Sequence, residues 1–192
     1  MPRIYIIIWI VSGLWIMGEI GLAIRTHSSK RKDVSMQEQV SMRRLWLTII
    51  PCTIVGGFWS PQSFGLVRFV RDYIMYGGLI LMIVGLIIRV RAIYTLRKYF
   101  TVDVSILKNH QIIRKGEYKF IRHPAYAGGL LTFFGLGWAL GNWVSFVIIF
   151  FPVLWAFIRR INTEEKAQLL SSVGEEYTNY MRTTKRLIPW IY

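Results

Sequence analysis

Five apolar runs dominate this chain and limit the folds open to it. They cover residues 4–24, 45–66, 73–88, 124–140 and 143–158. A helix that crosses the hydrocarbon core of a bilayer needs about 20 mostly apolar residues, with about 17–25 usual. The first two runs meet this length, and we expect the other three to extend by a turn into their flanks. The first run is too long for a signal-peptide core and is followed by no small-residue cleavage site, so we expect it to be retained.

The basic residues predict how these helices are oriented. Of the 24 Lys and Arg, 21 fall in the segments that follow the first, third and fifth runs, and only Arg3, Arg68 and Arg71 fall on the other side. The positive-inside rule then places the N-terminus outside and the C-terminus in the cytosol. The formal net charge of +14 follows from this rule and from attraction to anionic headgroups, so we expect membrane lipids and no nucleic acid as partners. The predicted fold is an all-α, multi-pass integral membrane protein with five transmembrane helices.

Composition divides the chain into two parts. Residues 1–72 form an N-terminal transmembrane helix pair, and residues 73–192 form the part that carries the chemistry. Glu19 lies inside the first run, where a charge is costly unless it is paired or near the interface, and we interpret it as a structural or interfacial carboxylate. With the single Cys52 and three scattered histidines, we expect neither a disulfide framework nor a metal site.

The most informative motif is the stretch Arg-His-Pro-Ala-Tyr-Ala-Gly at 122–128, where a basic loop meets the run 124–140. Pro124 suits the first position of a helix, since its missing N–H would be unpaired there in any case. The start of a helix binds anions readily, and Arg122 adds a fixed positive charge. A polar, anion-binding site at a membrane boundary indicates an enzyme that brings a soluble cofactor and a lipid-like substrate together in one site.

The last two runs are joined only by Gly141-Asn142, which predicts a tight antiparallel helix hairpin. The run 124–140 is rich in glycine. For most of these glycines we favour close helix packing of the small-xxx-small type. For Gly128 we favour the close approach of a cofactor to the backbone.

Charged pairs follow the fifth run, at 159–160 and 164–165. We expect the two glutamates to begin a polar helix, where carboxylates interact favourably with the helix dipole. The apolar face of that helix continues with Leu170, Val173, Tyr177 and Tyr180. These charges are expected at the membrane level of Arg122 and His123. The cytosolic ends of the third, fourth and fifth runs are therefore the predicted active site.

The segment 114–128, with Arg114, Gly116, Tyr118 and then Arg-His-Pro-x-Tyr-x-Gly, resembles the signature of the isoprenylcysteine carboxyl methyltransferase family. A second half of the signature follows in Glu164-Glu165, with Leu169 slightly offset, in the stretch 174–180 and in Pro-Trp-Ile near the end. The resemblance covers residues 73–192, and the five-helix layout is similar to that of small prokaryotic and archaeal members.

The resemblance implies S-adenosylmethionine as the methyl donor and S-adenosylhomocysteine as the product. It implies a cytosolic pocket made by the loop before the fourth helix, the start of that helix and the C-terminal helix. The cofactor-binding candidates carried over by motif are Gly116, Tyr118, His123, Pro124, Tyr126, Gly128 and Glu165. By position in the preceding loop, His110, Gln111 and Ile113 are further candidates.

The implied acceptor is a lipophilic, prenylcysteine-like carboxylate that enters from the bilayer. Because the sulfonium methyl is already activated, the enzyme needs positioning more than acid–base groups. An α-carboxylate has a reference pKa near ~3.5 and is ionised without a general base. One arginine is expected to hold it, with Arg89, Arg122 and Arg159 as unranked candidates by membrane depth. The catalytic candidates are thus Arg122, Glu165, Arg159 and Arg89.

Other functions stay open at this point. A phospholipid amine as acceptor would require a base, for which Glu164, Glu165 or His123 would serve. A non-enzymatic lipid-binding or scaffold protein would bind no cofactor, and a reductase is disfavoured because the chain has no separate dinucleotide segment. The sequence decides neither the natural acceptor nor the oligomeric state.

Overall fold

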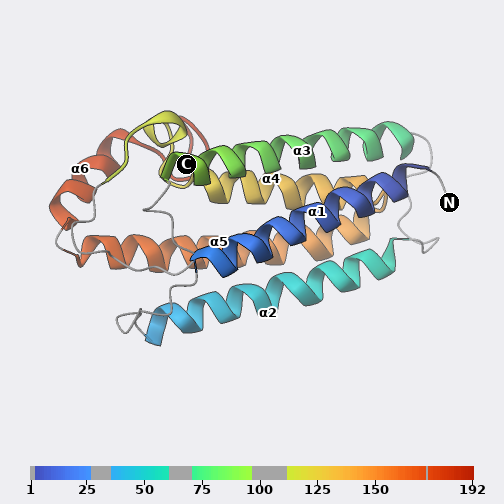
Figure 1. The fold of residues 1–192 in the computed structure, drawn as a ribbon, viewed down its shortest axis with the longest axis horizontal. Coiled ribbons are helices and arrows are strands. Elements are labelled where there is room, and N and C mark those ends of the chain that lie inside the picture. Colours follow the sequence, from blue (N-terminus) through green and yellow to red (C-terminus); the bar gives the residue numbers. More distant parts are fainter. Residues whose placement is uncertain (1–2, 27–35, 61–70, 97–111, 172) are drawn as a thin grey trace.

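The computed structural model describes residues 3–26, 36–60, 71–96, 112–171 and 173–192, and the named elements in these ranges are all helices (Figure 1). The elements are α1 (Arg3–Thr26), α2 (Met36–Trp59), α3 (Arg71–Leu96), the 3₁₀ turn η2 (Gly116–Lys119), α4 (Pro124–Ala139), α5 (Trp143–Leu169) and α6 (Gly174–Thr183). The prediction of an all-α protein is confirmed.

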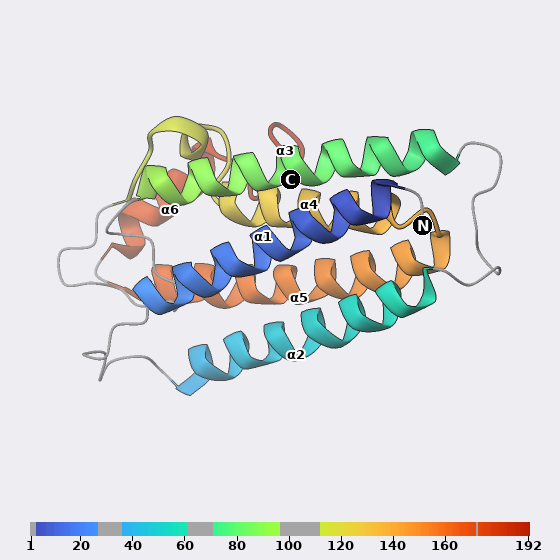
Figure 2. The ribbon, with the colours of Figure 1, turned by 45° about the vertical axis from the view of Figure 1, so that its right-hand side comes forward.

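The five long helices lie side by side along one axis, with α6 and η2 at one end of the bundle (Figures 1 and 2). Successive helices run in opposite directions, so the C-terminal ends of α1, α3 and α5 and the N-terminal ends of α2 and α4 lie at the end that carries α6. Within the described ranges, α1, α3 and α5 are long and apolar enough to cross a membrane.

The observed helix boundaries correct one prediction. The polar helix expected to begin at Glu164-Glu165 does not begin there, because α5 continues without interruption to Leu169. Both carboxylates therefore lie in the last turns of α5, and the amphipathic helix begins only at Gly174. The turn between them needs glycine at this position, since a Cβ on Gly174 would lie 2.2 Å from the carbonyl oxygen of Leu169. The charge pattern alone did not locate this turn.

Helices α3 and α4 pack backbone to backbone. A Cβ on Gly135 of α4 would lie 2.3 Å from the amide nitrogen of Met82, and one on Gly128 would lie 2.6 Å from that of Arg89. From the α3 side, a Cβ on Gly85 would lie 2.5 Å from the amide nitrogen of Thr132. Small residues permit this approach. The packing interpretation holds for Gly135, and it also accounts for Gly128.

The predicted hairpin between α4 and α5 is confirmed. Gly141 adopts a φ of 66°, in the left-handed region that glycine favours. The side chain of Asn142 then accepts a hydrogen bond from the backbone N–H of Val144 at 2.9 Å and caps α5. A three-residue connection, 140–142, therefore holds the two helices antiparallel.

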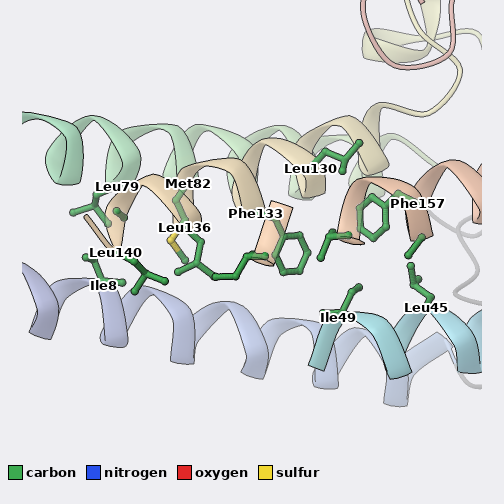
Figure 3. Packing of buried hydrophobic residues seen from close by; sticks show 14 of the residues in the cluster. Ile8, Leu45, Ile49, Leu79, Met82, Leu130, Phe133, Leu136, Leu140 and Phe157 are labelled. Carbon is green, nitrogen blue, oxygen red and sulfur yellow. The ribbon is translucent and has the colours of Figure 1, made fainter. Parts of the chain in front are cut away.

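All five long helices contribute to one apolar core (Figure 3). Its buried members include Ile8 of α1, Leu45 and Ile49 of α2, Leu79 and Met82 of α3, Leu130, Phe133 and Leu136 of α4, and Phe157 of α5. This core holds the five helices together along the bundle. The polar side chains gather at the end of the bundle that carries α6.

Candidate active site

A short backbone pairing joins the segment before α4 to the segment after α6. Ile121 and Lys185 form a parallel bridge. The amide of Arg122 donates to the carbonyl oxygen of Lys185 at 2.7 Å, and the amide of His123 donates to that of Arg186 at 3.1 Å. The motif at 122–128 is thereby fixed against a part of the chain far from it in sequence.

Glu165 is the centre of a buried ionic network at this pairing. Its Oε1 accepts from Nε of Arg122 at 2.9 Å and lies 3.2 Å from Nε2 of His123. Its Oε2 accepts from Nε and Nη2 of Arg186 at 2.9 and 2.5 Å. Only 4% of the Glu165 side chain is exposed. One carboxylate therefore ties α5 to the start of α4 and to the C-terminal segment.

Arg122 makes further contacts with the chain around α6. Its Nη1 donates to the carbonyl oxygen of Met181 at 3.3 Å and also to that of Thr184. The hydroxyl of Tyr180 donates to the carbonyl oxygen of Tyr118 at 2.5 Å, which links α6 to η2. These contacts hold α6 across the polar end of the bundle.

Glu164 has partners of its own and shares His123 with Glu165. The hydroxyl of Tyr126 donates to its Oε1 at 2.7 Å, and Nε of Arg160 lies 3.8 Å from the same oxygen. Nδ1 of His123 lies 3.7 Å from its Oε2. The His123 ring thus stands between the two neighbouring carboxylates, with one nitrogen toward Glu164 and the other toward Glu165.

A cavity of about 900 Å³ extends from this polar end into the space among the helices. Its charged and polar lining includes Glu19, Arg89, Arg122, His123, Glu164 and Gln168. Its apolar lining comes mainly from α1, α2, α4 and α5. The volume is in the range of about 300–1,000 Å³ that ligand sites occupy. One continuous space therefore borders both polar, charged groups and a large apolar wall.

The predicted site residues separate into distinct groups. The cavity lining includes Arg89, Ile113, Tyr118, Arg122, His123 and Tyr126. Glu165 and Gly128 are not among the described residues that line it. The other three described candidates do not line the cavity either. Pro124 is the first residue of α4, and Gly116 begins η2 with a φ of 58°. Arg159 is exposed, and its Cζ lies 4.6 Å from the centroid of the Trp155 ring. His110 and Gln111 lie outside the described residues.

Sequence reasoning missed Arg160 and Arg186. The side chain of Arg160 is 1% exposed and faces Glu164, at the i,i+4 spacing that helix periodicity could have revealed. Arg186 reaches Glu165 only because residues 185–186 pair with 121–123. No periodicity of apolar or charged residues in the sequence predicts that pairing.

Buried tyrosines surround the polar end. Burial raises the pKa of Tyr118 and of Tyr177 well above the usual range, and it raises the pKa of Tyr180 to about 12. The three phenols are therefore neutral near pH 7. Tyr118, Tyr177 and Tyr180 all line the cavity, which places neutral aromatic groups beside the charged ones.

Part of this chain is similar in sequence to known proteins. Residues 78–170 match the model of the isoprenylcysteine carboxyl methyltransferase (ICMT) family. The chain is 37% identical over 84 residues to protein-S-isoprenylcysteine O-methyltransferase of Schizosaccharomyces pombe, covering 44% of this chain and 35% of that one. It is 31% identical over 121 residues to the probable enzyme of Oryza sativa subsp. indica, covering 62% and 63%. These matches thus span less than two thirds of the relatives' lengths.

The fold is also similar to that of a solved structure, described as the eukaryotic intramembrane Ras methyltransferase ICMT without a monobody. The TM-score is 0.64 at 22% sequence identity, over 98% of this chain and 67% of that one. The matched segment contains the motif at 122–128 and both carboxylates of the polar site. Over residues 78–170, slightly less than half of its length, this chain is similar to the isoprenylcysteine carboxyl methyltransferase family.

Proposed function

We propose that this chain is an S-adenosylmethionine-dependent membrane methyltransferase that acts on the carboxylate of a lipophilic, prenylcysteine-like substrate. The observation that carries the proposal is the continuous cavity, which joins the groups around Arg122, His123 and Glu164 to an apolar space between helices. A soluble, charged cofactor and a lipid tail require these two environments side by side. The family match and the names of the relatives support the same reaction.

The residues at the polar end fit the cofactor. His123 stands at the start of α4, where a methionyl carboxylate would interact with the positive end of the helix. Glu164 borders the cavity and suits an ammonium group or a ribose hydroxyl. Tyr118 and Ile113 add apolar surface against which the adenine base of the cofactor would pack. When bound, S-adenosylmethionine supplies an activated methyl group.

Glu165 has a positioning role in this proposal. It contacts Arg122, His123 and Arg186 and is buried beside the cavity rather than facing it. Its carboxylate holds the two arginines and the imidazole in place before any ligand arrives. Such preorganisation favours transfer because positioned charges need no reorganisation during the reaction.

Among the arginines, we assign the acceptor carboxylate to Arg122. It borders the cavity next to His123 and Glu164. Arg89 also borders the cavity, but its Nε and Nη2 both donate to Glu19, whereas Arg122 donates to Glu165 through Nε alone. Arg159 lies against Trp155 on the outside. The contact between Arg122 and Glu165 would moderate the charge that reaches the acceptor, which keeps the carboxylate nucleophilic.

We further propose that all five long helices cross the membrane, with the N-terminus outside and the polar site at the cytosolic face. The alternating helix directions support this. The C-terminal ends of α1, α3 and α5 precede the basic segments of the sequence, and all three lie on the side of the bundle that carries α6. Residues 73–192 would form the catalytic part, and residues 1–72 would add the helices α1 and α2 that line the apolar space.

Calorimetric titration with S-adenosylhomocysteine tests the proposal on detergent-purified protein. The wild type should bind saturably, Glu165→Ala should lose binding, and Glu176→Gln should bind like the wild type. Glu176 forms an exposed ion pair with Arg114 away from the cavity, so it is a matched control. A helical wild-type protein that fails to bind S-adenosylhomocysteine would sink the proposal and favour a lipid-binding protein.

A further inference from the structure

Glu19 and Arg89 form a two-pronged ion pair inside the bundle. Nε of Arg89 donates to Oε1 of Glu19 at 2.5 Å, and Nη2 donates to Oε2 at 2.8 Å. The Glu19 carboxylate also accepts from Nε1 of Trp15 at 3.1 Å. Both charged side chains are mostly buried, at 17% and 18% exposure. The pair therefore joins α1 to α3 through a complete set of strong contacts.

The same arginine contacts the first turn of α4. Nη1 of Arg89 donates to the carbonyl oxygen of Ala125 at 3.1 Å. The Arg89 backbone lies directly against Gly128, so α3 and α4 are fixed relative to each other at this level. Ala125 lies between His123 and Tyr126, which both face the polar site. A chain of contacts thus runs from α1 through Arg89 to the segment that carries the site.

The pair also lies at a boundary within the cavity. Glu19 and Arg89 both line it, and the α1 neighbours Ile16 and Ile20 line it on either side of Glu19. The wall that α1 contributes is otherwise mainly apolar, and Trp15 packs edge-on against Phe133 at 4.8 Å. The ion pair therefore stands where the apolar space meets the charged groups.

An acceptor carboxylate that displaced Glu19 from Arg89 would leave Glu19 unpaired among apolar helices. Breaking a buried pair in this way is strongly unfavourable. The pair is thus expected to stay intact when the lipid enters, and Arg89 does not bind the acceptor directly.

From these observations we infer that Glu19 and Arg89 act together as a positioning pair, which holds α1 over the cavity and fixes where the acceptor's polar head stops relative to α4. The inference rests on the proposed function, because it concerns the acceptor of that reaction. Breaking the pair is expected to weaken use of the lipid acceptor and to leave cofactor binding unchanged, since the groups around Glu164 and Glu165 are held by separate contacts.

A double-mutant cycle tests this with Glu19→Gln, Arg89→Gln and the combined variant, and with Glu176→Gln as the control for an exposed pair. The acceptor is S-farnesylated N-acetylcysteine. Each single variant should raise its KM on the order of tenfold, as misplacement of a bound group does. The combined variant should be no worse than either single one, and affinity for S-adenosylhomocysteine should match the wild type in all of them.

An unchanged KM in Glu19→Gln, additive effects in the combined variant, or a parallel loss of S-adenosylhomocysteine affinity would each overturn the inference. Thermal unfolding of the wild type and the three variants of the cycle measures the coupling between Glu19 and Arg89 without any substrate. If the wild type binds no S-adenosylhomocysteine, the proposed function fails. Thermal coupling between positions 19 and 89 would then still support the contact of α1 with α3, and additive shifts would overturn it.

Discussion

Tyr126 donates its hydroxyl to Glu164 at 2.7 Å, and this contact joins the first turns of α4 to the last turns of α5. The tyrosine ring packs edge-on against Phe157 at 5.4 Å, so the phenol is held in place from its apolar side. The carboxylate that borders the cavity is therefore oriented by a neighbour within the same motif that begins α4.

Replacing Tyr126 with Phe should keep this ring packing and remove the hydrogen bond to Glu164. A hydrogen bond to a charged group contributes about 1.5–3 kcal/mol. We expect kcat/KM for methyl transfer to fall by roughly one to two orders of magnitude, since each ~1.36 kcal/mol is a factor of ten. The measurement is initial-rate kinetics with a prenylcysteine acceptor. Tyr73→Phe, at a highly exposed position of α3, is the control, and equal rates in the two variants would contradict a role for the contact.

The two neighbouring glutamates should differ in their effects on stability. Glu165→Ala leaves Arg122 and Arg186 without their shared carboxylate, and removing one partner of a buried pair costs about 3–5 kcal/mol. Glu164→Gln keeps a side chain that accepts from Tyr126 and should cost much less.

Thermal unfolding in detergent, compared with S-adenosylhomocysteine affinity, separates these effects. The melting temperature should fall mainly in Glu165→Ala, while Glu164→Gln should lose affinity with a nearly normal melting temperature. If Glu164→Gln is the less stable of the two, the assignment of Glu165 as the positioning carboxylate is mistaken.

Adjacent glycines on α3 offer a matched test of the packing between α3 and α4. A Cβ on Gly78 would lie 2.3 Å from the amide nitrogen of Ala139, whereas a Cβ on Gly77 meets nothing within 4 Å. Gly78→Ala should therefore destabilise the protein by about 1–3 kcal/mol through overpacking. Gly77→Ala should be neutral or stabilising by about 0.5–1 kcal/mol, because alanine favours a helix. Denaturant or thermal unfolding of both variants gives the comparison, and similar values would argue against this close contact.

Alkaline pH should destabilise the end of the bundle that carries α6. Burial raises the pKa of Tyr180 to about 12, above that of an unfolded tyrosine near ~10. The stability that the neutral phenol contributes is complete below pH ~10 and is lost as the pH rises toward the folded value. The melting temperature should thus decline across this interval. Tyr180→Phe should flatten that decline, and an unaltered pH dependence in this variant would rule out Tyr180 as its source.

Local sequence signals predicted those elements that depend on neighbouring residues. Pro124 marked the start of α4, and Gly141-Asn142 marked the turn to α5, because both act through the conformation of a few adjacent residues. The placement of Glu164 and Glu165 at a helix start was wrong, since two carboxylates at a helix N-terminus and two within a helix have the same local pattern.

The arrangement of the site depends on contacts between distant parts of the chain. Arg159 and Arg160 are equivalent by depth, and only the rotation of α5 buries Arg160 and turns Arg159 outward. The partnership of Arg186 with Glu165 follows from a backbone pairing that no periodicity encodes. The motif lies where the polar side chains meet, but it did not reveal which of the two neighbouring carboxylates faces the cavity.

The pairing of 121–123 with 185–186 sets an order of events during biosynthesis. All five long helices leave the ribosome before Arg186 does, so these helices can pack together while Glu165 still lacks one of its two arginines. The polar end is then completed only when the segment after α6 returns to the start of α4. A nascent chain arrested before this segment would be a helical bundle whose polar end is incomplete.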